Sequence, residues 1–287
     1  MARRATVIQE QREANQYVLL VDAGNALFST QDRLTLETKG RAIIEAYNFL
    51  GYDAMGLGQD DVQLGAEVLK ARIAEAQFPI VSANVYVGNS QDLLTRPYVI
   101  LERGGHRIAI LGLTWGEMFI PESLQQPTAS GPEPQPVPQP TVQTSGPVPP
   151  SFVNGLRVED PVVAASKYLA EIVPQADIIV VLSTMGSQYN QRLPAFFPMV
   201  DLVVSGGDAR RPAPPAPVLL PSNTVVAEAG YDGMWIGRVT MDFDSTGTMI
   251  RQDGEAYYLT DPPYSDEPAM REFLTKQVFA STPTPSP

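Results

Sequence analysis

Hydrophobic residues along the chain alternate between two kinds of spacing. Residues 17–21 (YVLLV) are a short apolar run that ends in Asp22-Ala23-Gly24-Asn25, which is typical of a buried strand followed by a turn. Residues 38–50 instead place their apolar side chains on one face at helical spacing and stop at Gly51. The repeated change between the two spacings predicts a parallel or mixed sheet with helices packed outside it.

The same reading predicts elements along most of the chain. Helices are expected over residues 2–15, 38–50, 63–76, 161–172, 188–197 and 267–279. Single strands are expected over residues 17–21, 54–57, 79–83, 178–183 and 201–205, and a hairpin over residues 98–102 and 107–112. Residues 225–229, 235–243 and 248–258 have the pattern of antiparallel strands.

One stretch breaks this alternation. Residues 125–152 are dominated by Pro, Gln, Ser, Thr and Gly, which predicts a disordered insertion. Neither flank makes a complete sheet, so we predict one domain over residues 1–280, interrupted by this insertion. Residues 281–287 form a Pro/Thr tail.

The composition limits the kinds of catalytic, metal-binding and partner-binding site that the chain can form. The 287 residues carry a net charge of −12, with no cysteine and a single histidine, His106. Thiol nucleophiles and Cys-rich zinc sites are therefore excluded, and the negative charge disfavours nucleic acid as a partner. No apolar run is long enough to span a bilayer, and the first fifteen residues lack the apolar core of a signal peptide, so we expect neither feature in this chain.

Several segments, taken in order, resemble motifs of the 5′-nucleotidase family of calcineurin-like metallophosphoesterases. Residues 18–25 (VLLVDAGN) resemble the motif that ends in Gly-Asp, and residues 50–65 resemble the segment with Gly-Asn-His-Glu-Phe-Asp. Residues 182–186 (LSTMG) and 203–210 (VVSGGDAR) stand where the family has Ser-His-Leu-Gly and Gly-Gly-His-Ser-His. The resemblance covers nearly the whole chain outside the insertion. It implies an α/β fold, a metallophosphoesterase-like four-layer α/β/β/α sandwich.

The resemblance also implies a two-metal site, and the residues at its positions depart from the family pattern. The bridging aspartate corresponds to Asn25, the asparagine ligand to Gln59, the catalytic histidine to Asp60 and its orienting aspartate to Gln63. The later histidine ligands correspond to Thr184, Asp208 and Arg210. Amides cannot balance two dications, and the guanidinium of Arg210 cannot ligate a metal.

Residual acids leave a second interpretation open. Asp22, Asp60, Asp61 and Asp208 could gather at the carboxyl edge of the sheet and hold Mg²⁺ or Ca²⁺ through oxygen ligands. Alternatively, these acids cap helices and solvate loops, which is common for aspartate. We favour the interpretation that these acids cap helices and solvate loops, and we expect no bound metal.

These observations favour a non-catalytic homologue, a pseudoenzyme that keeps the scaffold for binding, either to another protein or within a larger cell-surface or periplasmic assembly. The sequence identifies no partner. The alternative is a weak phosphoesterase that uses Mg²⁺ or Mn²⁺ and the residual carboxylates. The resemblance implies an extracytoplasmic location, periplasmic or at the cell surface. The family's opening Asp-x-His motif has no counterpart here, so we expect residues upstream of Met1 in the native product.

Overall fold

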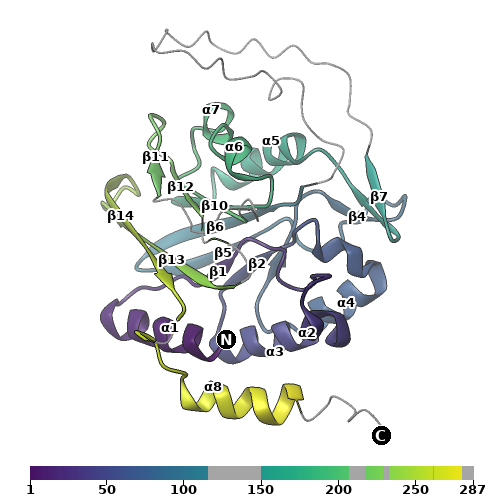
Figure 1. The fold of residues 1–287 in the computed structure, drawn as a ribbon. Helices are drawn as coiled ribbons and strands as arrows, with labels where there is room; N and C mark the ends of the chain where they lie inside the picture. Colours follow the sequence, from purple (N-terminus) through teal and green to yellow (C-terminus); the bar gives the residue numbers. More distant parts are fainter. Residues whose placement is uncertain (116–149, 207–216, 229, 231–232, 261, 280–287) are drawn as a thin grey trace, which may run out of the picture.

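Helices and strands are stacked in four layers in this computed structural model, which describes residues 1–115, 150–206, 217–228, 230, 233–260 and 262–279 (Figure 1). Two layers of helices enclose two layers of sheet. The expected α/β/β/α sandwich is therefore confirmed.

The first half of the chain supplies one sheet and one helical layer. Strands β1 (Val21–Asp22), β2 (Ala54–Gly56) and β3 (Ile80–Val81) pair in parallel in the order β1-β2-β3. The helices around them are α1 (Ala2–Ala14), α2 (Arg33–Thr38), α3 (Arg41–Leu50), the 3-10 helix η1 (Asp61–Leu64) and α4 (Ala66–Glu75). Helices α1 and α3 lie below the sheet in Figure 1.

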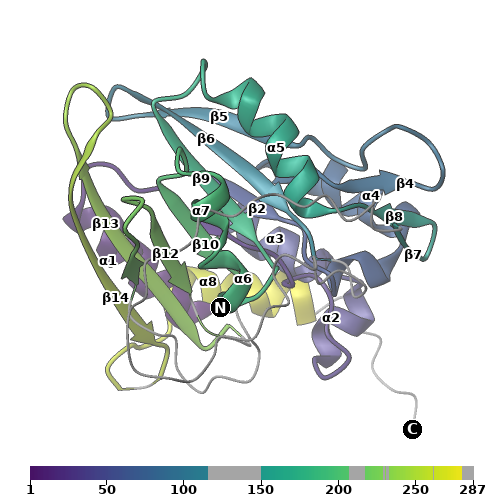
Figure 2. The same ribbon diagram turned by 90° about the horizontal axis from the view of Figure 1, so that it is seen from above.

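The second sheet has six strands in the order β11-β12-β10-β9-β6-β5. They are β5 (Tyr98–Arg103), β6 (His106–Leu113), β9 (Ile178–Ser183), β10 (Leu202–Ser205), β11 (Val218–Leu219) and β12 (Val225–Glu228). The inner four run parallel, and β5 and β11 are antiparallel edges. Helices α5 (Pro161–Ile172), α6 (Ser187–Asn190) and α7 (Leu193–Phe196) cover the outer face (Figure 2).

Two smaller units complete the described fold. Strands β4 (Val85–Val87), β7 (Ser151–Val153) and β8 (Leu156–Val158) form a three-stranded antiparallel sheet. Strands β13 (Trp235–Phe243) and β14 (Met249–Tyr258) form a long antiparallel ribbon. Helix α8 (Pro268–Phe273), which continues as η3 (Leu274–Phe279), lies outside α1 and α3 in Figure 1.

Three hydrophobic clusters correspond to the three interfaces between the layers. The first joins α1, α3 and α4 to the small sheet and includes Tyr47 and Met55. The second packs α5, α6 and α7 on the large sheet. The third lies between the sheets and contains mostly aliphatic side chains, among them Val81, Ile110 and Leu182. Burial of these apolar surfaces is the main force that holds the layers together.

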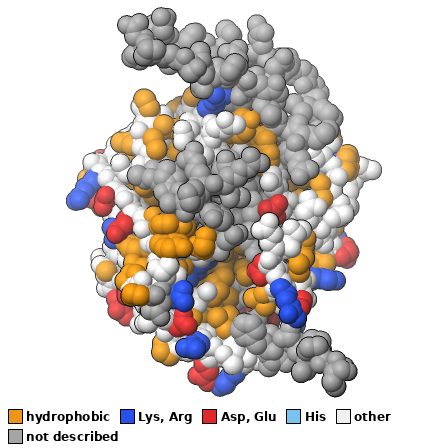
Figure 3. Space-filling view, in the orientation of Figure 1, with side chains coloured by type: hydrophobic (Ala, Val, Ile, Leu, Met, Phe, Trp, Pro, Cys, Tyr) orange, Lys and Arg blue, Asp and Glu red, His pale blue; other side chains and the backbone are white. Residues whose placement is uncertain are grey.

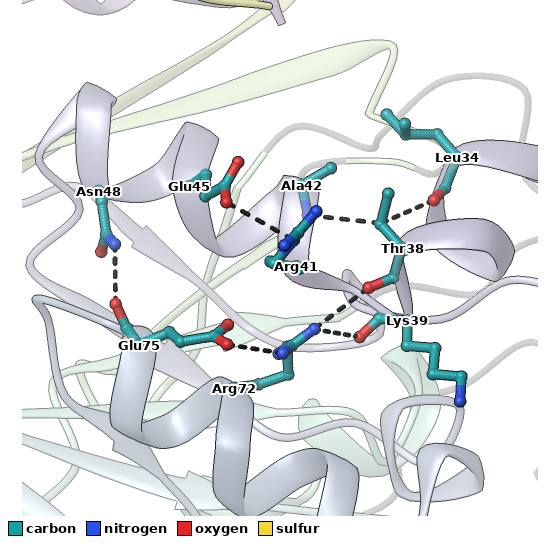
Figure 4. A network of polar contacts seen from close by, with 9 residues as sticks. All are labelled: Leu34, Thr38, Lys39, Arg41, Ala42, Glu45, Asn48, Arg72 and Glu75. Atoms are coloured by element: carbon teal, nitrogen blue, oxygen red, sulfur yellow. Dashed lines mark hydrogen bonds and ion pairs between the residues drawn. The ribbon is translucent and has the colours of Figure 1, made fainter. Parts of the chain in front are cut away.

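Polar contacts also fix the lower helices relative to one another (Figure 4). The guanidinium of Arg72 on α4 donates to the carbonyls of Thr38 and Lys39, where α2 ends, and pairs with Glu75. The amide of Asn48 on α3 donates to the carbonyl of Glu75. Helix α4 is therefore bonded to both α2 and α3.

The structure corrects several expected elements. The helix expected over 38–50 begins at Arg41, because Lys39 and Gly40 have φ angles of 49° and 78° and separate it from α2. Gly65 similarly separates η1 from α4, and the helix expected over 188–197 is two short helices. The strand expected over 17–21 pairs only at Val21–Asp22.

Other corrections concern the second half of the chain. Residues 225–229 are expected to be antiparallel, and β12 does pair antiparallel with β11, but it pairs with β10 in parallel. Most of the proline-rich stretch, and the tail over 281–287, lie outside the described residues. The last two residues assigned to that stretch, Ser151 and Phe152, belong to β7.

The carboxyl group of Asp201 gives the fold a testable pH dependence. Burial raises its pKa to about 6 from 3.8, although its Oδ2 accepts a hydrogen bond from the backbone N–H of Ile179. Between pH 3.8 and about 6 the folded state keeps a proton that the unfolded state loses, so the unfolding free energy falls as pH rises through this window.

We predict that Asp201→Asn removes that fall, of up to about 2–3 kcal/mol, because the amide oxygen still accepts from Ile179 and carries no charge to bury. Urea unfolding at a series of pH values measures the slope. Asp253→Asn, at an exposed position of β14, is the matched control and should keep the wild-type slope. An unchanged slope in Asp201→Asn would show that this carboxyl is not the cause.

Candidate functional site

The candidate site lies where the parallel strands of both sheets end. Asp22 is the last residue of β1, and Asn25 lies in the loop that follows this strand. The loop after β2 carries Gln59 and Asp60. Thr184 follows β9 of the large sheet. Figure 3 shows hydrophobic side chains exposed on the face of the molecule that Figure 1 presents.

Asp61 holds the two loops of the small sheet together. Its carboxylate is fully buried and accepts hydrogen bonds from three backbone N–H groups, those of Asn25 at 2.9 Å, Leu27 at 2.7 Å and Gly58 at 2.9 Å. Burial raises the pKa of Asp61 to about 7, and the three N–H donors oppose that rise. This acid therefore serves the backbone and is unavailable to a ligand.

Asn25 is held in a strained and crowded position. Its φ angle is 62°, and its side-chain Oδ1 accepts a hydrogen bond from the backbone N–H of Asp60 at 2.9 Å. A Cβ atom on Gly58 would lie 1.9 Å from this oxygen, so only glycine fits there. The amide that stands in place of a bridging carboxylate is thus bonded within the protein.

Asp22 is also committed to internal contacts. Its Oδ2 accepts from the hydroxyl of Tyr47 at 2.7 Å and its Oδ1 accepts from the N–H of Gly24 at 2.9 Å. Burial and the charge of Asp22 raise the pKa of Tyr47, so this hydroxyl stays protonated. The buried guanidinium of Arg4 donates to the hydroxyls of Tyr47 and Tyr52, which connects α1 to the end of β1.

Buried polar side chains join the two sheets behind the site. The hydroxyl of Thr114, just after β6, donates to the carbonyl of Leu57, just after β2, at 2.8 Å. The side-chain amide of Asn84 donates to the carbonyls of Thr114 and Glu159 and accepts from the N–H of Thr114. The ends of β2 and β6 are therefore fixed relative to each other.

Thr184 lies at the end of β9, where its buried hydroxyl accepts from the backbone N–H of Trp115 at 3.1 Å. The Trp115 ring stacks on Tyr189, with 5.1 Å between ring centroids. The side chain of Gln63 is exposed, and its backbone carbonyl accepts a hydrogen bond from the side-chain amide of Asn154. Asp60 is exposed and precedes η1.

Gln59 differs from its neighbours because its side-chain Oε1 is buried and has no hydrogen-bond partner among the residues that the structure describes. A buried acceptor of this kind is costly unless a donor or a cation reaches it. Asp208 and Arg210, the remaining positions expected in the site, lie outside the described residues. The structure therefore brings together Asp22, Asn25, Gln59 and Asp60.

These residues do not fit a pair of divalent metal ions. Among the described residues no three Asp, Glu or His side chains gather in a way that could hold a metal. Oxygens of Asp22, Asn25 and Thr184 already accept hydrogen bonds from the protein, and an amide and a hydroxyl offer no negative charge. The described residues of this edge therefore offer two dications too few free ligands and too little negative charge.

Sequence reasoning missed how these acids are used. The pattern placed Asp22 and Asp61 at the correct edge but could not show that both point into the protein. The Tyr47 and Arg4 contacts join residues far apart in the chain, and only the spacing of Tyr47 on the buried face of its helix hinted at a role.

Comparison with known proteins supports the family resemblance. No family model matches the chain. A snake venom 5′-nucleotidase from Gloydius brevicauda is 27% identical over 280 residues, covering 90% of this chain and 42% of that protein. A 5′-nucleotidase from Diplobatis ommata is 28% identical over 283 residues, covering 90% of this chain and 43% of that protein.

Solved structures show the same fold. A 5′-nucleotidase precursor from Thermus thermophilus superposes with a TM-score of 0.71 at 24% identity, covering 96% of this chain and 52% of that one. The calcineurin-like phosphoesterase YfkN from Bacillus subtilis gives a TM-score of 0.69 at 18% identity, covering 96% of this chain and 87% of that one.

Asp61 provides the prediction that tests this arrangement. Asp61→Ala leaves three N–H groups without their acceptor, so we expect a loss of about 3 kcal/mol or more in unfolding free energy at pH 8. Asp61→Asn keeps one oxygen but turns an amide N–H₂ toward an N–H donor, so its loss should be smaller than that of alanine and still measurable. Urea unfolding gives both values, and equal stability of all three proteins would contradict the assignment.

The chain spans about two fifths of the length of the two curated relatives described above. Their sequence similarity and the shared four-layer architecture agree. The chain is therefore a homologue of the 5′-nucleotidase-type phosphoesterases and has the calcineurin-like phosphoesterase fold.

Proposed function

We propose that this protein is a non-catalytic member of its group, a pseudoenzyme that keeps the phosphoesterase scaffold in order to bind a partner protein. The observation that carries this proposal is the chemistry at the carboxyl edge of the sheets. Asn25, Gln59 and Thr184 are neutral, and the carboxylates of Asp22 and Asp61 accept hydrogen bonds from neighbouring groups of the protein.

Hydrolysis of a phosphate ester by two metal ions depends on the charge of the site residues and on whether their oxygens are free. Two metal ions orient the ester and activate a water molecule, and they need anionic or imidazole ligands that are free to reach them. His106, the only histidine of the chain, is the first residue of β6. Its ring centroid lies 6.2 Å from that of Phe243. It pairs with Arg103 at the hairpin turn, at the opposite end of β6 from the site edge.

The described part of the chain contains no helix of the length and apolar character needed to cross a membrane. Two other features support a role in binding outside the cytoplasm. Several relatives are 5′-nucleotidases of snake venom. Exposed apolar residues on the edge strand β11, Val218 and Leu219, offer surface of the type that partner proteins cover.

Metal content and turnover test the proposal directly. After incubation with Mn²⁺ or Mg²⁺ and gel filtration, we expect less than stoichiometric metal by mass spectrometry and no hydrolysis of p-nitrophenyl phosphate above the buffer rate. Circular dichroism shows that the protein used is folded. Stoichiometric metal with turnover that Asp208→Ala abolishes would overturn the proposal in favour of the weak Mg²⁺- or Mn²⁺-dependent phosphoesterase.

A gain-of-ligand variant gives the complementary measurement. Asn25→Asp with Gln59→Asn and Thr184→His supplies an acid, a shorter amide and an imidazole, so we expect tighter Mn²⁺ binding than in the wild type. Asn223→Asp with Gln252→Asn and Thr275→His makes the same substitutions away from the site and should leave Mn²⁺ affinity unchanged. Equal affinity in both triple variants would show that these positions are not what limits metal binding.

A further inference from the structure

Strand β14 has one edge that no other strand of the described chain covers. It pairs with β13 along its other edge, and these two strands form a sheet of their own. The ribbon that they make lies at the left of the molecule in both Figure 1 and Figure 2. With its ten residues, β14 is long for an exposed edge, and an open edge of this kind is a template for pairing with another strand.

The hydrogen bonds of the ribbon show which backbone groups face the open edge. The N–H of Leu259 donates to the carbonyl of Met234 at 2.8 Å, so these two residues form a hydrogen-bonded pair. Such pairs alternate with non-hydrogen-bonded pairs along an antiparallel ribbon. The odd-numbered residues from 251 to 257 therefore point their backbone groups at β13, and Gln252, Gly254 and Ala256 point theirs at the open edge. Within the described chain these three residues have no backbone partner on that side.

Two opposite charges lie on one face of this strand with little internal compensation. Arg251 is exposed and forms no ion pair with any residue that the structure describes. The carboxylate of Asp253 is 63% exposed and lies 3.9 Å from an amino nitrogen of Arg238, which has a closer partner in Glu255 at 3.1 Å. Arg251 and Asp253 are two residues apart, so their side chains leave β14 on the same side.

These charges select one register for a second copy of the strand. Because the open backbone groups belong to even-numbered residues, two antiparallel copies pair even residues with even and odd residues with odd. With Gln252 opposite its own copy, each Arg251 lies opposite Asp253 of the other copy. Registers centred on residues 251, 253 or 254 instead place Arg251 opposite itself, Asp253 opposite itself, or Asp253 opposite Glu255. Like charges directly opposite each other destabilise a strand pair.

We propose that β14 pairs antiparallel with β14 of a second copy of this chain, about a two-fold axis at Gln252, and so joins two ribbons into one four-stranded sheet. The interface is isologous, so the Arg251–Asp253 contact occurs twice. It also places Ile250, which is 68% exposed, opposite Gly254 of the other copy. This surface is separate from the residues of the candidate site, and the proposal does not depend on whether the protein hydrolyses anything.

Charge reversal tests the register. Arg251→Asp places carboxylates opposite each other, and Asp253→Arg places guanidinium groups opposite each other. In sedimentation velocity over a concentration series, we expect a reversible dimer in the wild type and a dissociation constant raised roughly tenfold or more in each variant. Arg33→Asp makes the same change at an 83%-exposed position of α2 and should dimerise as the wild type does. Circular dichroism shows that each variant is folded.

An equimolar mixture of the Arg251→Asp and Asp253→Arg proteins provides the complementary measurement. Opposite charges then face each other at both contacts, so the mixture should dimerise more tightly than either variant alone. A wild type that stays monomeric at every concentration, a dimer that neither variant weakens, or a mixture that regains no affinity would overturn the proposal.

A single introduced cysteine locates the contact in a chain that has none of its own. Directly opposite residues of an antiparallel pair have Cα atoms about 4.5–5.5 Å apart, which a disulfide spans. Oxidised glutathione should therefore link two Gln252→Cys chains, as their two thiols are oxidised to a disulfide and the glutathione is reduced. Val163→Cys, at a 66%-exposed position of α5, should remain unlinked. Equal linking of both variants would contradict pairing at Gln252.

Discussion

The arrangement of the site edge depends on one buried carboxylate. Asp61 accepts three backbone N–H groups from two different loops and thereby fixes the turn after β1 against the turn after β2. The position of Asn25, and through it the backbone of Asp60, follows from these bonds. A single internal acid thus ties both loops to one common hydrogen-bond acceptor.

Much of the fold could be predicted because local signals agreed with tertiary packing. Helix α5 and strand β9 have the expected bounds, since Asp160 and Pro161 mark the helix start and the strand is apolar throughout. The errors occurred where backbone geometry overrides side-chain spacing. Lys39 is a helix-forming residue, yet its positive φ ends α2, and no pattern of apolar residues reveals this. The short strands β4, β7 and β8 depend on pairing between distant segments, which hydrophobic spacing does not encode.

The candidate site was predictable in position and not in chemistry. Parallel strands end at one edge, so the loops with Asp22 and Gln59 were expected to meet. Which way each side chain turns depends on partners such as Tyr47 and Gly24, and these are set by the folded backbone. A residual acid in the sequence is therefore poor evidence for a ligand until its hydrogen bonds are known.

The bond from the hydroxyl of Thr114 to the carbonyl of Leu57 has a mechanical consequence. It joins the two sheets at the edge where their loops begin, and the side-chain amide of Asn84 donates to the carbonyl of Thr114 at the same edge. Sliding of one sheet over the other would break these buried hydrogen bonds, so shear between the sheets is disfavoured. Conformational changes at this edge would therefore occur in the loops, while the two sheets stay fixed relative to each other.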